Sequence, residues 1–240
     1  MGTLIASRGM TSASVPVVTI DGPSSSGKGT ISRIVASRIG WHLLDSGALY
    51  RLVALGGILK GLDPDDVEEH VAVARSMRVE FGSVGAGEER VMLDGRDVTQ
   101  KIRNEQAGAG ASRVAAWPAV RAALTERQRA FAQPPGLVAD GRDMGTVIFP
   151  GAQLKVFLTA SAEERAQRRH KQLIGKGSAA SLAALSREIA ERDLRDSTRQ
   201  VAPLKPAPDA QLLDSTGLSI DAVVERVLSL GRERGLWPKV

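Results

Sequence analysis

Cysteine is absent from this 240-residue chain, which excludes disulfide bonds, thiolate metal ligands and a cysteine nucleophile. Aromatic residues make up only 3% of it, so Ala, Val, Leu and Ile must build the core, and few rings are left to stack on nucleic-acid bases. No apolar run approaches the length of a membrane span. We therefore expect a globular, cytoplasmic protein without a nucleic-acid or membrane partner.

Histidine is scarce as well, and His42, His70 and His170 lack the spacing of metal ligands. The formal net charge is +5, which suits nucleic acid but equally suits a site for polyanionic small molecules. Residues 1–14 are small and polar and lack the apolar stretch of a secretory signal. We expect these residues to form a disordered tail.

Short apolar runs alternate with helical patterns along most of the chain. Strands are expected at residues 15–20, 42–44, 136–139, 153–158 and 211–213, and helices at residues 28–39, 49–59, 104–115, 118–132, 162–173 and 182–195, with a last helix capped by Ser219. This alternation predicts an α/β fold in which helices cover both faces of a parallel sheet. Asp63 and Pro64 predict the N-cap and first turn of a further helix.

One segment breaks the alternation. Residues 78–81 and 90–93 alternate polar and apolar side chains on either side of a glycine-bearing turn. This pattern predicts an antiparallel hairpin, which we interpret as part of an insertion into the parallel fold.

The clearest motif is the glycine-rich segment GPSSSGKGT, which lies between a predicted strand and a predicted helix. Its backbone N–H groups and the helix N-terminus would surround an anion, and Lys28 would contact the β- and γ-phosphates of a nucleotide. Ser or Thr usually follows this lysine directly, but here Gly29 does, so Thr30 contacts either Mg²⁺ or only a phosphate. The predicted ATP-binding loop comprises Gly22, Pro23, Ser24, Ser25, Ser26, Gly27, Lys28, Gly29 and Thr30.

Two further polar segments, DSGALYR and DGRDMGTVIFP, also follow predicted strands. Ligands of open parallel sheets bind beyond the carboxyl ends of the strands, where Asp21, Asp45 and Asp140 are expected to meet. Asp140 would either bind the water molecules around Mg²⁺ or serve as a capping or turn residue.

A third cluster, Arg192, Asp196 and Arg199, has the spacing of one helix face. That spacing alone favours a solvated face with ion pairs over a binding site.

The blocks IDGPSSSGKGT, LLDSGALYR, ADGRDMGTVIFP, ERDLRDSTR and VAPL resemble bacterial cytidylate kinases in order and spacing. Ser25 departs from this pattern, since many of those proteins have glycine there. The resemblance implies a single P-loop kinase domain over residues 15–240, with a five-stranded parallel core. It also implies a monophosphate-binding insertion near residues 73–115 and a mobile lid near residues 168–198. The implied reaction moves the γ-phosphoryl group of ATP to CMP or dCMP with Mg²⁺, in pyrimidine nucleotide metabolism, on a monomer.

The resemblance also implies roles for individual residues. The implied catalytic residues are Lys28, Arg51, Arg142 and Arg192, and Arg168 and Arg169 would help to hold the adenine nucleotide. The implied CMP-binding residues are Ser46, Arg51, Ser112, Arg121, Arg142, Asp143, Arg192, Asp196 and Arg199. A carboxylate accepts a hydrogen bond from the cytosine amino group but opposes the matching uracil oxygen, so Asp143 would separate CMP from UMP.

Three alternatives remain open. A kinase for UMP, AMP or dTMP would share the motifs. A GTPase-like switch would read guanine through Asn-Lys-x-Asp, yet the only asparagine, Asn104, precedes Glu105. A nucleic-acid-binding protein without catalysis would need basic stripes with stacking aromatics, of which the chain offers little.

Overall fold

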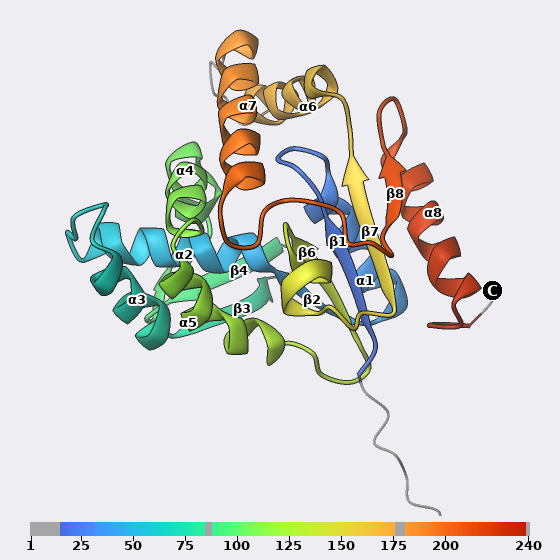
Figure 1. The fold of residues 1–240 in the computed structure, drawn as a ribbon, viewed down its shortest axis with the longest axis horizontal. Helices are drawn as coiled ribbons and strands as arrows, with labels where there is room; N and C mark the ends of the chain where they lie inside the picture. The colour runs from blue at the N-terminus through green and yellow to red at the C-terminus, as the bar shows by residue number, and fades with distance from the viewer. Residues whose placement is uncertain (1–14, 85–87, 176–180, 239–240) are drawn as a thin grey trace, which may run out of the picture.

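The computed structural model describes residues 15–84, 88–175 and 181–238. The predicted tail at residues 1–14 lies outside them. Five parallel strands form the central sheet, in the order β2-β6-β1-β7-β8, which confirms the predicted core (Figure 1). The strands are β1 (Val17–Asp21), β2 (His42–Asp45), β6 (Leu137–Gly141), β7 (Leu154–Thr159) and β8 (Gln211–Asp214).

Helices cover both faces of this sheet because its strands carry apolar side chains on both sides. The helices are α1 (Lys28–Ile39), α2 (Ser46–Leu59), α3 (Val67–Ser76), α4 (Glu105–Val114), α5 (Pro118–Arg129), α6 (Ala162–Ile174), α7 (Leu182–Thr198) and α8 (Ile220–Glu233). On one face, Val18 and Ile20 of β1 pack with α1 and α8. On the other face, Val17 of β1 and Leu44 of β2 pack with α2, which in turn packs against α3 and α4.

The predicted hairpin is present as part of a separate sheet. Antiparallel strands β3 (Val79–Val84) and β4 (Glu88–Leu93) pair with each other, and the short β5 (Arg96–Asp97), which the sequence did not predict, pairs with β4. A short 3₁₀ turn, η1 (Lys101–Arg103), then leads into α4. The predicted insertion at about residues 73–115 includes these elements. That it forms a separate monophosphate-binding subdomain stays a prediction.

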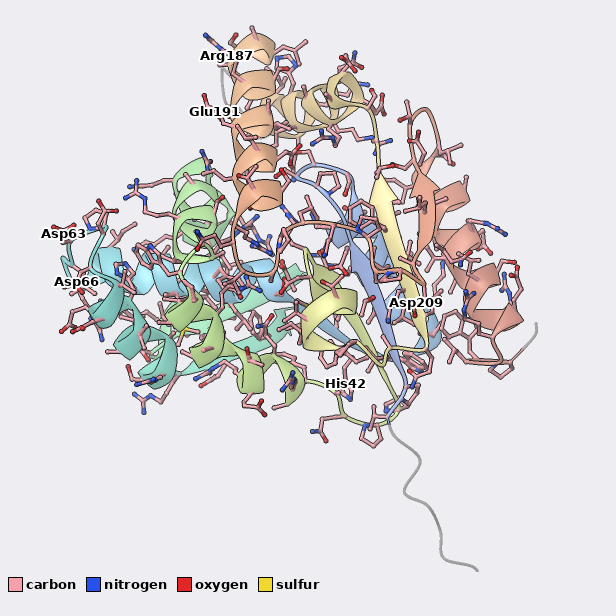
Figure 2. The ribbon with its side chains drawn as sticks, viewed as in Figure 1. His42, Asp63, Asp66, Arg187, Glu191 and Asp209 are labelled. Carbon is pink, nitrogen blue, oxygen red and sulfur yellow. The ribbon has the colours of Figure 1, made fainter. Side chains whose placement is uncertain are left out.

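The predicted helix start at Asp63 is wrong. Asp63 accepts a hydrogen bond from the N–H of Asp65 at 2.9 Å and closes a turn, whereas Asp66 caps α3 by accepting from the N–H of Glu69 at 3.0 Å (Figure 2). The sequence from Asp66 places an acidic residue at the third helical position, which favours a helix start there. Pro64 fits the turn as well as it would fit a helix, because its fixed φ suits both.

The two helices α6 and α7 stand above the carboxyl ends of the strands, on the same side as the loop that follows β1 (Figure 1). The segment between α7 and β8 then crosses in front of the sheet (Figure 1). Among the residues that the structure describes, no helix combines the length and apolar character needed to cross a membrane. The fold therefore gathers loops, strand ends and two long helices at one edge of the sheet.

Candidate active site

A cleft of about 890 Å³ opens at this edge of the sheet. All the residues predicted to catalyse or to bind CMP line it: Lys28, Ser46, Arg51, Ser112, Arg121, Arg142, Asp143, Arg192, Asp196 and Arg199. The predicted ATP-binding residues that line it are Ser24, Ser25, Gly27, Lys28, Gly29, Thr30 and Arg169, whereas Gly22, Pro23, Ser26 and Arg168 are not part of its lining. The fold thus brings distant segments together, while the role of each residue stays a prediction.

The loop between β1 and α1 is shaped by left-handed backbone. Gly22 has φ 158°, and a Cβ there would lie 2.1 Å from the carbonyl oxygen of Leu158. Gly27 has φ 91° and forms the N-cap of α1. Ser25 also has a positive φ, of 59°, which costs a residue with a Cβ about 1–2 kcal/mol. Glycine would therefore fit the backbone at position 25 better than serine does.

Gly29, which replaces the usual Ser or Thr after the lysine, faces the end of β6. A Cβ at this position would lie 3.1 Å from Oδ2 of Asp140, closer than side chains ordinarily approach. The small residue lets the Asp140 carboxylate pack against the first turn of α1. The hydroxyl of Thr30 follows one position later, on an exposed part of the cleft wall.

Lys28 and Asp140 form the electrostatic centre of the cleft, and both are buried. Burial, and then the positive charge of Arg142, lower the pKa of Lys28 to about 7, although Asp140 opposes this shift. Burial raises the pKa of Asp140 to about 7, although Lys28 opposes it. The Lys28 ammonium donates to the carbonyl of Pro23 at 3.1 Å. A phosphate bound beside Lys28 would favour its charged form.

The predicted position of three aspartates at the carboxyl ends of neighbouring strands is confirmed. Asp45 pairs in register with Asp140 on the neighbouring strand, and Asp21 ends β1 beside them. Asp21 accepts hydrogen bonds from the N–H groups of Met144 and Gly145, at 2.9 and 2.8 Å. It thereby holds the segment after β6, where the π-helical turn η2 (Met144–Ile148) begins, against β1.

Three arginines from separate elements face the cleft. Arg142 Nε donates to Oδ2 of Asp196 at 2.8 Å, and its Nη2 donates to the Ser24 hydroxyl at 3.3 Å. Arg51 donates to the carbonyl of Ile102 at 3.3 Å. Burial and the charge of Arg142 lower the pKa of Arg192 to about 9, so this guanidinium is held among like charges.

The Nε atoms of Arg51 and Arg192 are buried without a hydrogen-bond partner in the described part of the chain. Buried donors without partners cost free energy, and a bound anion would satisfy them. The cluster is therefore suited to a phosphate group.

Asp143 occupies a different environment from its neighbour Arg142. Its Oδ2 accepts a hydrogen bond from Arg121 Nη2, and its Oδ1 lies 3.6 Å from Arg199 Nη2, beyond hydrogen-bond distance. Burial raises the pKa of Asp143, although Arg121 and Arg199 oppose that shift. The Arg121 guanidinium also lies over the Tyr50 ring, 5.7 Å from its centre. One carboxylate oxygen thus keeps capacity to accept a hydrogen bond from a ligand.

The donor set suits a magnesium ion held mainly through phosphates and water. Among the described residues, no group of three His, Asp or Glu side chains converges on a common point that could hold a metal. Asp140 is nevertheless a buried carboxylate beside the phosphate loop, with Asp45 close enough to raise its pKa further. A divalent cation beside Asp140 would favour its charged form against the effects of burial and of the Asp45 charge. Oxygen atoms, such as those of a carboxylate, are the ligands that Mg²⁺ prefers.

The sequence did not predict one set of contacts behind the phosphate loop. Arg168, which was predicted to contact ATP, donates to the carbonyl of Ser26 at 3.2 Å and to the carbonyl of Ser215 at 2.7 Å. Arg165 and Asp193 hold the same loop at Ser24. Helical spacing places these side chains on α6 and α7 but does not say which loop those helices approach.

A parallel α/β sheet with a phosphate-binding loop after its first strand, faced by arginines from several elements, defines a P-loop kinase fold. The sequence model of the family described as Cytidylate kinase matches residues 18–233. The cytidylate kinase of Pseudomonas syringae pv. tomato is 60% identical over 215 residues, which cover 89% of this chain and 94% of that protein.

The cytidylate kinase of Stutzerimonas stutzeri is 57% identical, over 92% of this chain and 97% of its own length. That of Pseudomonas aeruginosa strain PAO1 is 59% identical, over 89% and 94%. The chain belongs to the cytidylate kinase family.

Proposed function

We propose that this protein transfers the γ-phosphoryl group of ATP to CMP or dCMP, yielding ADP and CDP or dCDP. The observation that carries the proposal is the pair Arg142 and Asp143 in one cleft. Arg142 reaches the phosphate loop, whereas Asp143 presents a partly unsatisfied carboxylate between two arginines. A carboxylate so placed fits the cytosine amino group and disfavours the uracil oxygen.

The chemistry requires no general base from the protein. The second pKa of a phosphate monoester is about 6, so the acceptor is already anionic at neutral pH. Lys28 would bind the transferred phosphoryl group, and Arg51, Arg142 and Arg192 would hold the acceptor phosphate in line with it. The rate enhancement would then come from orientation and neutralisation of charge rather than from proton transfer.

Magnesium would be held by the phosphates, by water and by Asp140, with Thr30 as a second candidate, and would neutralise charge on the phosphoryl oxygens when bound. Arg168 and Arg169 would contribute to the adenine-nucleotide side. The remaining CMP-site residues, Ser46, Ser112, Arg121, Asp196 and Arg199, would hold the sugar and base.

The larger-scale predictions belong to the same proposal. Residues 73–115 would form the monophosphate-binding insertion, and residues 168–198 would close as a lid that keeps water from the phosphoryl group. The protein would act as a monomer in the cytoplasm, without nucleic acid.

The decisive experiment measures ADP release from Mg²⁺-ATP with CMP, dCMP, UMP, AMP and dTMP in turn. The proposal expects the highest kcat/KM with CMP or dCMP. Higher turnover with UMP, AMP or dTMP would identify a kinase for another monophosphate.

Lys28→Met tests the phosphate loop in the same assay, because the variant keeps a similar volume and loses the charge. We expect turnover to be lost while the thermal unfolding midpoint stays near that of the unmodified protein. Lys60→Met, an exposed lysine after α2, is the matched control and should retain activity. Near-normal turnover by Lys28→Met would contradict its catalytic role.

A further inference from the structure

One residue of the phosphate loop, Ser24, is held from outside through both of its backbone polar groups. The N–H of Ser24 donates to Oδ1 of Asp193 at 3.2 Å, and the carbonyl of Ser24 accepts from Nη1 of Arg165 at 3.1 Å. Arg165 also pairs directly with Asp193 and donates through Nε to the carbonyl of Ala160 at 3.1 Å. An ion pair between α6 and α7 therefore clamps the loop at one residue.

The clamp supplies hydrogen-bond donors to carbonyl groups that the phosphate loop turns outward. Backbone N–H groups that turn toward an anion leave carbonyl oxygens turned outward, and buried carbonyls require donors. Arg165 supplies the donor for Ser24, and Arg168 supplies one for the carbonyl of Ser26 at 3.2 Å.

The residue between these two carbonyls is Ser25, whose φ of 59° is unfavourable for a side chain with a Cβ. Such strain persists only where the surrounding structure holds the backbone on both sides. The two arginines of α6 provide that support.

The same ion pair links the loop to the acceptor side of the cleft. Asp193 is the neighbour of Arg192 on α7 and lies one helical turn before Asp196, and both of those residues line the cleft. The Ser24 hydroxyl in turn accepts a hydrogen bond from Arg142, which also pairs with Asp196. The position of α7, and with it two side chains of the acceptor site, is thus tied to the shape of the loop.

We propose that Arg165 and Asp193 are positioning residues that hold the phosphate loop in its nucleotide-binding conformation and set α7 relative to it. The inference deepens the proposed function, since it concerns how that site is ordered. Its primary test uses ADP binding alone, so its outcome does not depend on which monophosphate is phosphorylated.

The test compares Arg165→Met, Asp193→Asn and the double variant with two controls on the same helices, Lys171→Met and Glu191→Gln. Both control side chains are exposed, and Glu191 lies on the outer side of α7 (Figure 2). Asp193→Asn keeps the shape of the side chain, so it stays informative if Arg165→Met folds poorly. Thermal denaturation establishes that each variant compared is folded.

Calorimetry measures the Kd for ADP, and hydrogen exchange measures the protection of amides at residues 22–30. Because a hydrogen bond to a charged group is lost, we expect each single variant to weaken ADP binding by roughly tenfold, which corresponds to about 1.4 kcal/mol. The double variant should be little worse than either single variant, because one interaction is removed in all three. Protection at residues 22–30 should fall, and the controls should match the unmodified protein.

Kinetics supply a second readout. A clamp on the phosphate loop predicts a raised KM for ATP in the folded variants, with the KM for CMP raised as well because α7 is displaced. ADP affinity and loop protection equal to those of the two controls would overturn the inference, as would strictly additive effects in the double variant. Normal ADP binding by the unmodified protein without turnover of CMP would instead overturn the proposed function and leave the clamp standing.

Discussion

Removing the charge of Asp143 should affect both stability and substrate choice. The side chains of Asp143, Arg121 and Arg199 are 3%, 6% and 6% exposed. Asp143→Asn would leave two buried guanidinium groups facing each other without the carboxylate between them. Because an unpaired buried charge costs about 3–5 kcal/mol, we expect the free energy of unfolding to fall by roughly 3 kcal/mol. Arg121 keeps its position over Tyr50, so the lower end of that range applies.

The same substitution should weaken the discrimination between CMP and UMP. An amide side chain presents a donor as well as an acceptor, so it opposes the uracil oxygen less than a carboxylate does. A base contact of this kind is worth about 1–3 kcal/mol, which corresponds to a fall of roughly tenfold to a hundredfold in the CMP-to-UMP ratio of kcat/KM.

Urea denaturation and ADP-release kinetics with both nucleotides check the two effects together. Glu126→Gln is the matched control, since its ion pair with Arg129 lies on the exposed surface and should contribute little. A CMP-to-UMP ratio and an unfolding free energy that both equal those of the control would refute the reasoning about Asp143.

Three further predictions concern the phosphate loop. Ser25→Gly should relieve the strain of the left-handed backbone at this position. Because glycine also gives the unfolded chain more entropy, the net gain in the free energy of unfolding should be about 0.5–1 kcal/mol. A lower thermal unfolding midpoint would contradict this prediction. Gly29→Ser should place a side chain against Asp140, lower kcat/KM by roughly tenfold or more and reduce the free energy of unfolding by about 1–3 kcal/mol. Gly151→Ser is the control and should change neither quantity, because a Cβ at that position meets nothing within 4 Å. Equal effects at both sites would argue against the contact with Asp140. Burial lowers the pKa of Lys28 to about 7 and bound phosphate would raise it again, so the contribution of Lys28 to ADP affinity should be complete below pH 7 and decline as the pH rises above 7. Lys28→Met should lack that decline when Kd is measured across this range, and an identical pH dependence in both proteins would show that Lys28 is not the titrating group.

Local patterns in the sequence were sufficient for most of the fold. The helix at residues 28–39 was predicted with the bounds that the structure has, and Ser219 caps α8 as expected, accepting from the N–H of Ala222 at 3.2 Å. These features depend on neighbouring residues, through side-chain periodicity and capping, so they can be read without knowledge of the fold. The error at Asp63 arose where two local signals competed, because Pro64 suits a turn and a helix start alike.

The candidate site was predicted by a different route. Spacing alone favoured a solvated face for Arg192, Asp196 and Arg199, and only the resemblance to cytidylate kinases placed them in a binding site. The structure brings all three to the cleft, but only Arg192 and Asp196 belong to α7. The prediction of one shared helix face is wrong for Arg199, because the helix ends at Thr198 and the backbone of Arg199 is extended. Hydrophobic periodicity did not predict that these residues line the cleft, because they face a polar cleft rather than an apolar core.

What the sequence by itself determined is the order of strands and helices, the phosphate loop and the chemical character of the residues at the strand ends. Only the tertiary structure decided that Asp140 packs against Gly29, that Ser25 is left-handed, and that Arg165 and Asp193 hold Ser24. The physical reason is that these contacts join segments far apart in the chain, as with Ser24 and Asp193, which are separated by 169 positions. Their energies depend on how sheet and helices pack, and no local pattern records that packing.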